Sequence, residues 1–92
     1  MPEKARIHLI IHGQVQGVFF RTRGKEKALE LGLLGWIKNN SDGTVELVAE
    51  GEKQALKEFI AWCGQGTSSA RVEKVETQWQ DFKGEFACFR IK

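Results

Sequence analysis

The sequence has few cysteines, little net charge and no long apolar run, and each shortage argues against a class of protein. Its only two cysteines, Cys63 and Cys88, show no C-x-x-C spacing, so we expect neither a redox motif nor a native disulfide. The formal net charge is +2 and basic residues form no run, so neither a nucleic-acid partner nor a membrane surface is expected. No apolar stretch approaches 18 residues and no secretory leader is recognised, which predicts a soluble, cytoplasmic protein.

The length of 92 residues suits one domain that buries about 60–65% of its unfolded surface. We therefore expect a single domain over residues 1–92, acting as a monomer. His8 and His12 alternate with apolar residues along one predicted strand, and no third ligand stands at a supporting spacing. Neither a metal nor a cofactor is expected.

Hydrophobic periodicity predicts the order strand, helix, strand, strand, helix, strand, with one further short strand. The strands are expected at 7–12, 35–39, 44–50, 72–79 and 85–91, and the helices at 21–31 and around the apolar stripe of 55–63. Gly32 is suited to end the first helix, and Ser41-Asp42-Gly43 to close a hairpin. The apolar phase of the fourth strand shifts between Val72 and Val75, which indicates a β-bulge. This order predicts an α+β fold, the ferredoxin-like α/β sandwich (βαββαβ), with two helices on one face of an antiparallel sheet of four to five strands.

The most informative segment runs from Gly13 to Arg21 and reads Gly13-Gln14-Val15-Gln16-Gly17-Val18-Phe19-Phe20-Arg21. It joins a predicted strand to a predicted helix. Backbone N–H groups of a glycine-containing turn, a helix N-terminus and an arginine fork together make a suitable cradle for an anion. The alternative is a loop whose glycines serve the backbone alone and whose arginine is merely solvated.

Simple geometry brings Asn39 to this segment. A helix from Arg21 to Gly32 is about 18 Å long, and the strand that returns from Gly35 covers about 16 Å by Asn39. Asn39 therefore arrives level with Arg21, on the strand face that it shares with Ile37. The alternative is that Asn39 only caps the hairpin or satisfies a backbone group.

Two motifs resemble those of the acylphosphatases. Gly13 to Arg21 matches the pattern G-x-V-Q-G-V-x-F-R, and Gly35 to Gly43 matches G-W-V-[RK]-N-x-x-D-G. The resemblance covers nearly the whole chain. It departs at Gly66-Thr67-Ser68-Ser69, where the family usually carries Gly-Pro, so we expect a more flexible loop there.

The resemblance implies a function and a set of site residues. It implies hydrolysis of the carboxyl-phosphate bond of an acyl phosphate to a carboxylate and inorganic phosphate, without metal or cofactor. Arg21 is expected to hold the phosphate and Asn39 to orient the attacking water, which makes these two the catalytic residues. The phosphate-binding residues are expected to be Gln14, Val15, Gln16, Gly17, Val18 and Arg21.

The chemistry of the loop agrees with this substrate class, because the segment from Gly13 to Arg21 has no Cys, His or carboxylate. An acyl phosphate releases a carboxylate, whose conjugate acid has a pKa of about 4 to 5, so no general acid is needed at neutral pH. Phosphoryl transfer then requires mostly positioning and charge stabilisation. The acyl group itself is left open, since acetyl, carbamoyl and glyceroyl phosphates share one head group.

Three other functions are alternatives to this interpretation. A cysteine phosphatase requires C-x5-R, whereas seven residues separate Cys63 from Arg71. An RNA-binding module of this topology requires aromatic residues on its third strand, and 44–50 has none. An acylphosphatase-like domain that binds a phosphorylated or carbamoylated ligand without turnover, or serves carbamoyl-transfer machinery, remains the main competitor.

Overall fold

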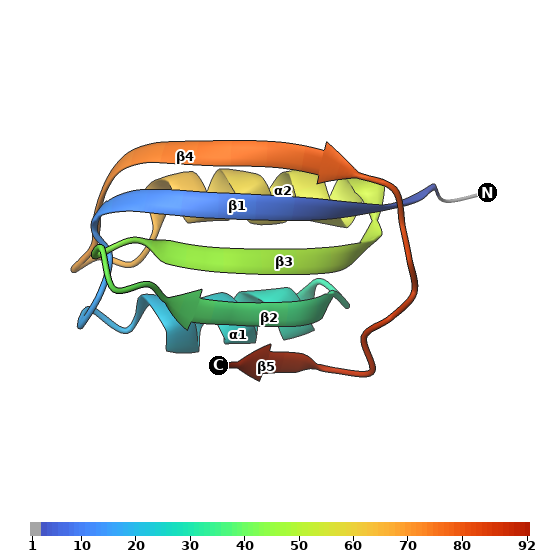
Figure 1. Cartoon of the computed structure of the whole chain (residues 1–92), viewed down its shortest axis with the longest axis horizontal. Coiled ribbons are helices and arrows are strands. Elements are labelled where there is room, and N and C mark those ends of the chain that lie inside the picture. Colours follow the sequence, from blue (N-terminus) through green and yellow to red (C-terminus); the bar gives the residue numbers. More distant parts are fainter. Residues whose placement is uncertain (1–2) are drawn as a thin grey trace.

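A computed structural model describes residues 3–92, which form two layers (Figure 1). The elements are β1 (Lys4–Gln14), α1 (Phe20–Glu30), β2 (Leu34–Asn39), β3 (Val45–Glu52), α2 (Lys53–Gln65), β4 (Arg71–Gln80) and β5 (Phe89–Ile91). In Figure 1 both helices lie behind the sheet, α2 behind β4 and β1 and α1 behind β2. The ferredoxin-like arrangement expected from the sequence is confirmed.

The strand order across the sheet is β4-β1-β3-β2-β5. β1 pairs antiparallel with β3 and β4, and β2 pairs antiparallel with β3, whereas β5 runs parallel to β2. Two expectations are therefore wrong in detail: the sheet is mixed, and its last strand covers only Phe89–Ile91 instead of 85–91. The reason is that residues 81–88 cross from one sheet edge to the other, so β5 begins at the end of the sheet where β4 stops.

A buried ion cluster holds this crossing segment. The Oε2 atom of Glu50, a residue only 2% exposed, accepts hydrogen bonds from the backbone N–H of Lys83 at 2.7 Å and of Gly84 at 3.3 Å. Arg6 donates to Glu50 at 3.5 Å and also to Glu85. These contacts fix the path to β5 through residues that lie far apart in the sequence.

The core lies between the sheet and the helices. Its strand residues are Ile7, Leu9 and Ile11 of β1, Ile37 of β2 and Val45, Leu47 and Ala49 of β3, and all are fully buried. Leu56, Phe59 and Cys63 form the buried stripe of α2, as the periodicity predicts. Burial raises the pKa of the Cys63 thiol, whereas Cys88 is exposed, and both cysteines are free. Neither helix of the described chain is long and apolar enough to cross a membrane.

The expected bulge is present in β4 and shapes the end of β1. The pairing with β1 runs from Lys74 opposite His12 directly to Val72 opposite Gly13, so Glu73 has no partner. Gly13 has a φ of 127°, and a Cβ atom there would lie 2.0 Å from the carbonyl oxygen of Arg71. Only glycine fits this approach of two strands, which sets the point where the chain leaves the sheet for the loop that follows.

Candidate active site

The segment between β1 and α1, residues 15–19, turns through left-handed backbone conformations. Gly17 has a φ of 73° and Phe19 a φ of 62°. Nothing lies within 4 Å of a Cβ built on Gly17, so its conformation, not crowding, favours glycine there. The turn is anchored to the protein by Val15, whose side chain is buried in the core. Alternation of left- and right-handed residues is the geometry in which successive N–H groups form an anion-binding concavity.

The backbone donors of this loop are free. Among the hydrogen bonds formed by residues 3–92, none uses the N–H of residues 15–19 as donor. Helix α1 begins immediately afterwards, with Phe19 at its N-cap, no side-chain cap and no acidic residue in its first turn. The loop therefore presents unpaired N–H groups together with the uncapped positive end of a helix, and both attract an anion.

Arg21 stands in the first turn of α1, beside these donors. It lines a cavity of ≈310 Å³ together with Val15, Gly17, Phe19, Phe20 and Thr22. Its neighbour Arg23 is paired with Glu26 at 2.9 Å, whereas Arg21 takes part in no ion pair among the described residues. An arginine fork without a carboxylate partner is available to an anion.

Close packing of α1 on β2 places Asn39 at the same end of the molecule. A Cβ at Gly24 of α1 would lie 3.0 Å from the Cδ1 atom of Ile37 in β2, so helix and strand touch at this point. Arg21 lies about 4–5 Å from Gly24 along the helix axis, and Asn39 about 6–7 Å beyond Ile37 along the strand, both toward the loop. Figure 1 shows the start of α1 and the end of β2 at one end of the sheet. The prediction that Asn39 lies level with Arg21 agrees with this packing.

Asn39 carries the most informative polar atom of the site. Its Oδ1 atom is buried and has no hydrogen-bond partner among residues 3–92. A buried acceptor without a donor is costly unless water or a ligand supplies one. The contacts that close the hairpin belong instead to its neighbours.

The hairpin after Asn39 is held by Asn40, Asp42 and Thr44. The Asn40 N–H donates to the carbonyl of Thr44 at 2.8 Å, and the Asn40 amide donates to the Thr44 hydroxyl at 3.0 Å. Asp42 accepts hydrogen bonds from the hydroxyl and the N–H of Thr44, and these lower the pKa of its carboxyl. The hairpin is therefore a well-braced support for the end of β2.

Gln16 connects the loop to this hairpin, a role that the sequence did not reveal. Its side-chain amide donates to the carbonyl oxygens of Asn40 at 2.7 Å and of Thr44 at 2.9 Å. Gln16 is one of the predicted phosphate-binding residues, and its side chain makes this contact with the hairpin. No local pattern signals this contact, because its partners lie 24 and 28 positions away. Gln14, by contrast, is the last residue of β1 and pairs with Arg71, so the free loop begins at Val15.

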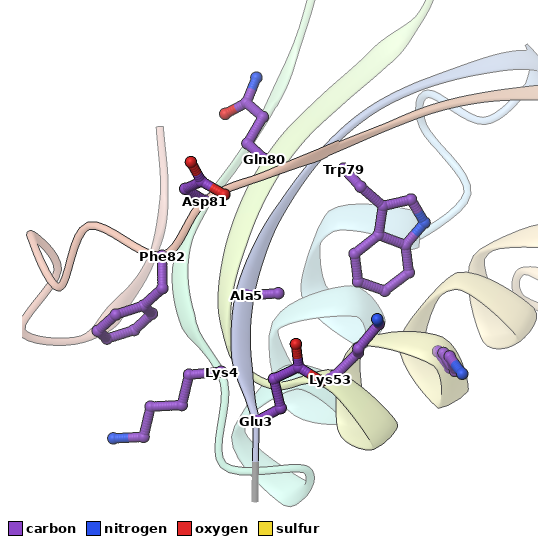
Figure 2. Close-up of a pocket in the computed structure, with 9 residues that line it drawn as sticks. Glu3, Lys4, Ala5, Lys53, Trp79, Gln80, Asp81 and Phe82 are labelled. Atoms are coloured by element: carbon purple, nitrogen blue, oxygen red, sulfur yellow. The ribbon is translucent and has the colours of Figure 1, made fainter.

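A larger hollow, of ≈550 Å³, lies at the opposite end of the sheet, where β1 begins and β4 ends (Figure 2). Figure 2 shows Trp79 and Phe82 on its walls, with Lys4 and Lys53 nearby. None of its lining residues belongs to the two motifs. Its lining mixes lysine and carboxylate side chains, which does not indicate a particular ligand or reaction. The cavity beside Arg21 is smaller but combines N–H donors and a guanidinium group that are unpaired within residues 3–92.

Comparison with known proteins agrees with the fold and the motifs. An acylphosphatase of Pelotomaculum thermopropionicum is 47% identical over 88 residues, which cover 96% of each chain. The solved acylphosphatase of Coxiella burnetii is 39% identical and superimposes with a TM-score of 0.91, covering 97% of this chain and 93% of that one. The acylphosphatase of Bacillus subtilis, at 32% identity, gives a TM-score of 0.92 over 96% and 98% of the two chains. Residues 7–91 match the family model described as Acylphosphatase, and the chain therefore belongs to the acylphosphatases, enzymes that hydrolyse acyl phosphates.

Proposed function

We propose that the phosphoryl group of the substrate is bound by Gln14, by the N–H groups of residues 15–18 and by Arg21, with the N–H of Phe19 as a further donor. The observation that carries this proposal is a set of N–H groups that have no acceptor within residues 3–92, next to an arginine that has no carboxylate partner there. The N–H groups contact the non-bridging phosphate oxygens, and the guanidinium binds two oxygens through its planar fork. Both interactions strengthen as negative charge redistributes in the transition state.

Asn39 orients the attacking water in this proposal. Its buried Oδ1 atom has no donor in the described part of the chain, and a water molecule that donates to it would satisfy that atom. A neutral amide is far too weak a base to remove a proton, so its contribution is position. The water is held for attack on phosphorus, opposite the acyl oxygen.

The reaction needs no acid from the protein. A bond forms between the water oxygen and phosphorus, and the bond between phosphorus and the acyl oxygen breaks with its electron pair on the carboxylate. The protons of water pass to a phosphate oxygen and to solvent. Because the carboxylate leaves as a stable anion, the absence of Cys, His and carboxylate side chains from Gly13 to Arg21 is compatible with rapid turnover.

Two assays test this proposal. Benzoyl phosphate should be hydrolysed far faster than a phosphate monoester at equal concentration, because the monoester requires protonation of a poor leaving group. Turnover should also survive a chelator, since loop N–H groups and Arg21 supply the charge stabilisation. Equal rates on both substrates, or a strict requirement for Mg²⁺, would contradict this chemistry. Binding of phosphate without product release would identify the non-hydrolysing alternative.

We further propose that the chain acts as a single domain over residues 1–92, as a cytoplasmic monomer without a nucleic-acid partner. The small net charge of +2 supports the last point. Light scattering at several concentrations tests the monomer, and a concentration-dependent doubling of mass would contradict it.

A further inference from the structure

Thr67 contacts the loop between β1 and α1 at Val18. It lies between α2 and β4, 49 positions from Val18, and its hydroxyl donates a 3.0 Å hydrogen bond to the Val18 carbonyl oxygen. We propose that Thr67 is a positioning residue for catalysis: it fixes the orientation of the Val18–Phe19 peptide so that the loop N–H groups are set for phosphate. Because this role concerns the loop described above, it rests on the proposed function.

Peptide geometry explains how a bond to a carbonyl orients a donor. The described chain has no cis peptide, so the C=O of Val18 and the N–H of Phe19 point in opposite directions. A carbonyl directed at Thr67 turns the Phe19 N–H away from the segment that carries Thr67. That N–H donates to no other group among residues 3–92, so Thr67 determines its direction without consuming it.

The neighbouring backbone conformation is one that requires support. Phe19 is a non-glycine residue with a φ of 62°, an unfavourable conformation that persists only where surrounding contacts enforce it. Its own carbonyl accepts from the N–H of Arg23 at 2.9 Å, in the first turn of α1. Phe19 is therefore held on both sides, by α1 after it and by Thr67 through the peptide before it.

Thr67 itself is well anchored. Its carbonyl accepts a hydrogen bond from Ala70 at 3.1 Å, and the N–H of Gly66 donates to Trp62 at the end of α2 at 2.7 Å. A Cβ at Gly66 would lie 3.0 Å from the ring of Phe20, so the segment packs closely on the first residue of α1. Thr67 stands where the family usually carries proline, and its hydroxyl donates a hydrogen bond that proline cannot donate.

The test compares Thr67→Val, which keeps the shape and removes the hydroxyl, with Thr67→Ser, which keeps the donor. The inhibition constant of inorganic phosphate, the KM and kcat for benzoyl phosphate, and Tm are measured for each. We expect Thr67→Val to raise the phosphate inhibition constant about fivefold, the effect of one net hydrogen bond, and to lower kcat/KM at least as much. Thr67→Ser should stay within about twofold of the wild type, as should the control Ser68→Ala.

Each contrary result has a distinct meaning. Unchanged phosphate inhibition and kcat/KM in Thr67→Val, with or without a lower Tm, would show that Thr67 only supports the fold. If Thr67→Val is unfolded at the assay temperature, Thr67→Ala is measured in the cold, and failure of both to fold would equally overturn the positioning role. A wild type that does not hydrolyse benzoyl phosphate would overturn the proposed function instead, which the same assay detects.

Discussion

The Gln16 side-chain amide donates to the Asn40 carbonyl at 2.7 Å and so connects the loop of residues 15–19 to the hairpin that follows Asn39. The same amide reaches the Thr44 carbonyl at 2.9 Å, which makes Gln16 a clamp between the two motifs. The loop and Asn39, to which we assign phosphate binding and water orientation in the proposed function, are thereby held in one geometry.

Gln16→Ala should lower kcat/KM for benzoyl phosphate by about tenfold or more, because a shift of the loop relative to Asn39 spoils the attack geometry. Two carbonyls lose a donor, so the free energy of unfolding should also fall by about 1–2 kcal/mol. Steady-state kinetics and urea unfolding measure both. Gln54→Ala, an exposed glutamine on α2, serves as the matched control and should change neither. Wild-type kinetics in Gln16→Ala would show that the clamp is dispensable.

Arg21→Ala should lower kcat/KM by at least about 100-fold, because the charge on the phosphoryl oxygens loses its main cationic partner. Arg21→Lys should recover little of this loss, since an ammonium group cannot reproduce the planar fork. Arg23→Ala is the control: its side chain is exposed and, among residues 3–92, forms an ion pair only with Glu26, so activity should stay within twofold. Comparable turnover in Arg21→Ala and Arg23→Ala would place the phosphate elsewhere.

Asn39→Ala should nearly abolish turnover, by about 100-fold or more, while the protein remains folded. The fold should tolerate the change because the Asn39 side chain has no hydrogen-bond partner to lose among residues 3–92. Circular dichroism and the affinity for inorganic phosphate serve as controls, and both should remain close to the wild type. Lys38→Ala, on the same strand but the opposite face, should keep its activity. Loss of phosphate binding together with turnover would indicate that Asn39 binds phosphate and does not orient water.

Low pH should reduce the stability of the protein through Glu46, which lies on the face of the sheet that the helices do not cover. The His8 Nε2 atom lies 2.6 Å from the Glu46 carboxylate, and this hydrogen bond lowers the pKa of that carboxyl below its ordinary value of 4.5. A lowered pKa in the folded state stabilises the protein at pH values above 4.5 and ceases to do so as the pH falls through the lowered pKa. Glu46→Gln should therefore destabilise the protein at pH 7 by about 0.2–1 kcal/mol, the range for partly exposed pairs.

That difference between Glu46→Gln and the wild type should shrink steadily as the pH is lowered below 4.5, as urea unfolding at a series of pH values will show. A difference that is independent of pH would mean that the pair with His8 contributes through packing alone.

Gly13→Ala should destabilise the fold by about 2–4 kcal/mol, because its Cβ would lie 2.0 Å from the Arg71 carbonyl at a φ of 127°. Gly64→Ala offers the opposite case, because nothing lies within 4 Å of a Cβ built on Gly64, which is part of α2. This change should raise the free energy of unfolding by about 0.5–1 kcal/mol. Thermal unfolding of the two variants should shift Tm in opposite directions. Equal small shifts would show that β1 and β4 do not approach at Gly13 as described.

The parts of the molecule that the sequence predicts are those governed by local periodicity. Alternation identified the buried face of β1, and the changed phase between Val72 and Val75 located the bulge in β4. Helix and strand lengths placed Asn39 level with Arg21, and the close contact of Gly24 with Ile37 agrees with that placement.

The parts that the sequence did not predict depend on contacts between distant residues. The parallel direction of β5 follows from a crossing segment held by Glu50, which lies more than 30 positions away. The Gln16 and Thr67 contacts span 24 to 49 positions and use common polar side chains, which no local pattern distinguishes from solvated ones. The left-handed conformation of Phe19 could not be predicted from residue propensities either, because aromatic residues seldom adopt a positive φ.

Hydrolysis of benzoyl phosphate in ¹⁸O-labelled water tests the central claim most directly, because it reports which atom the oriented water attacks. If the loop and Arg21 hold the phosphoryl group and the water beside Asn39 attacks phosphorus, a single turnover places one ¹⁸O in inorganic phosphate and none in benzoate. Label in benzoate would show attack at the acyl carbon and would contradict this assignment of the site.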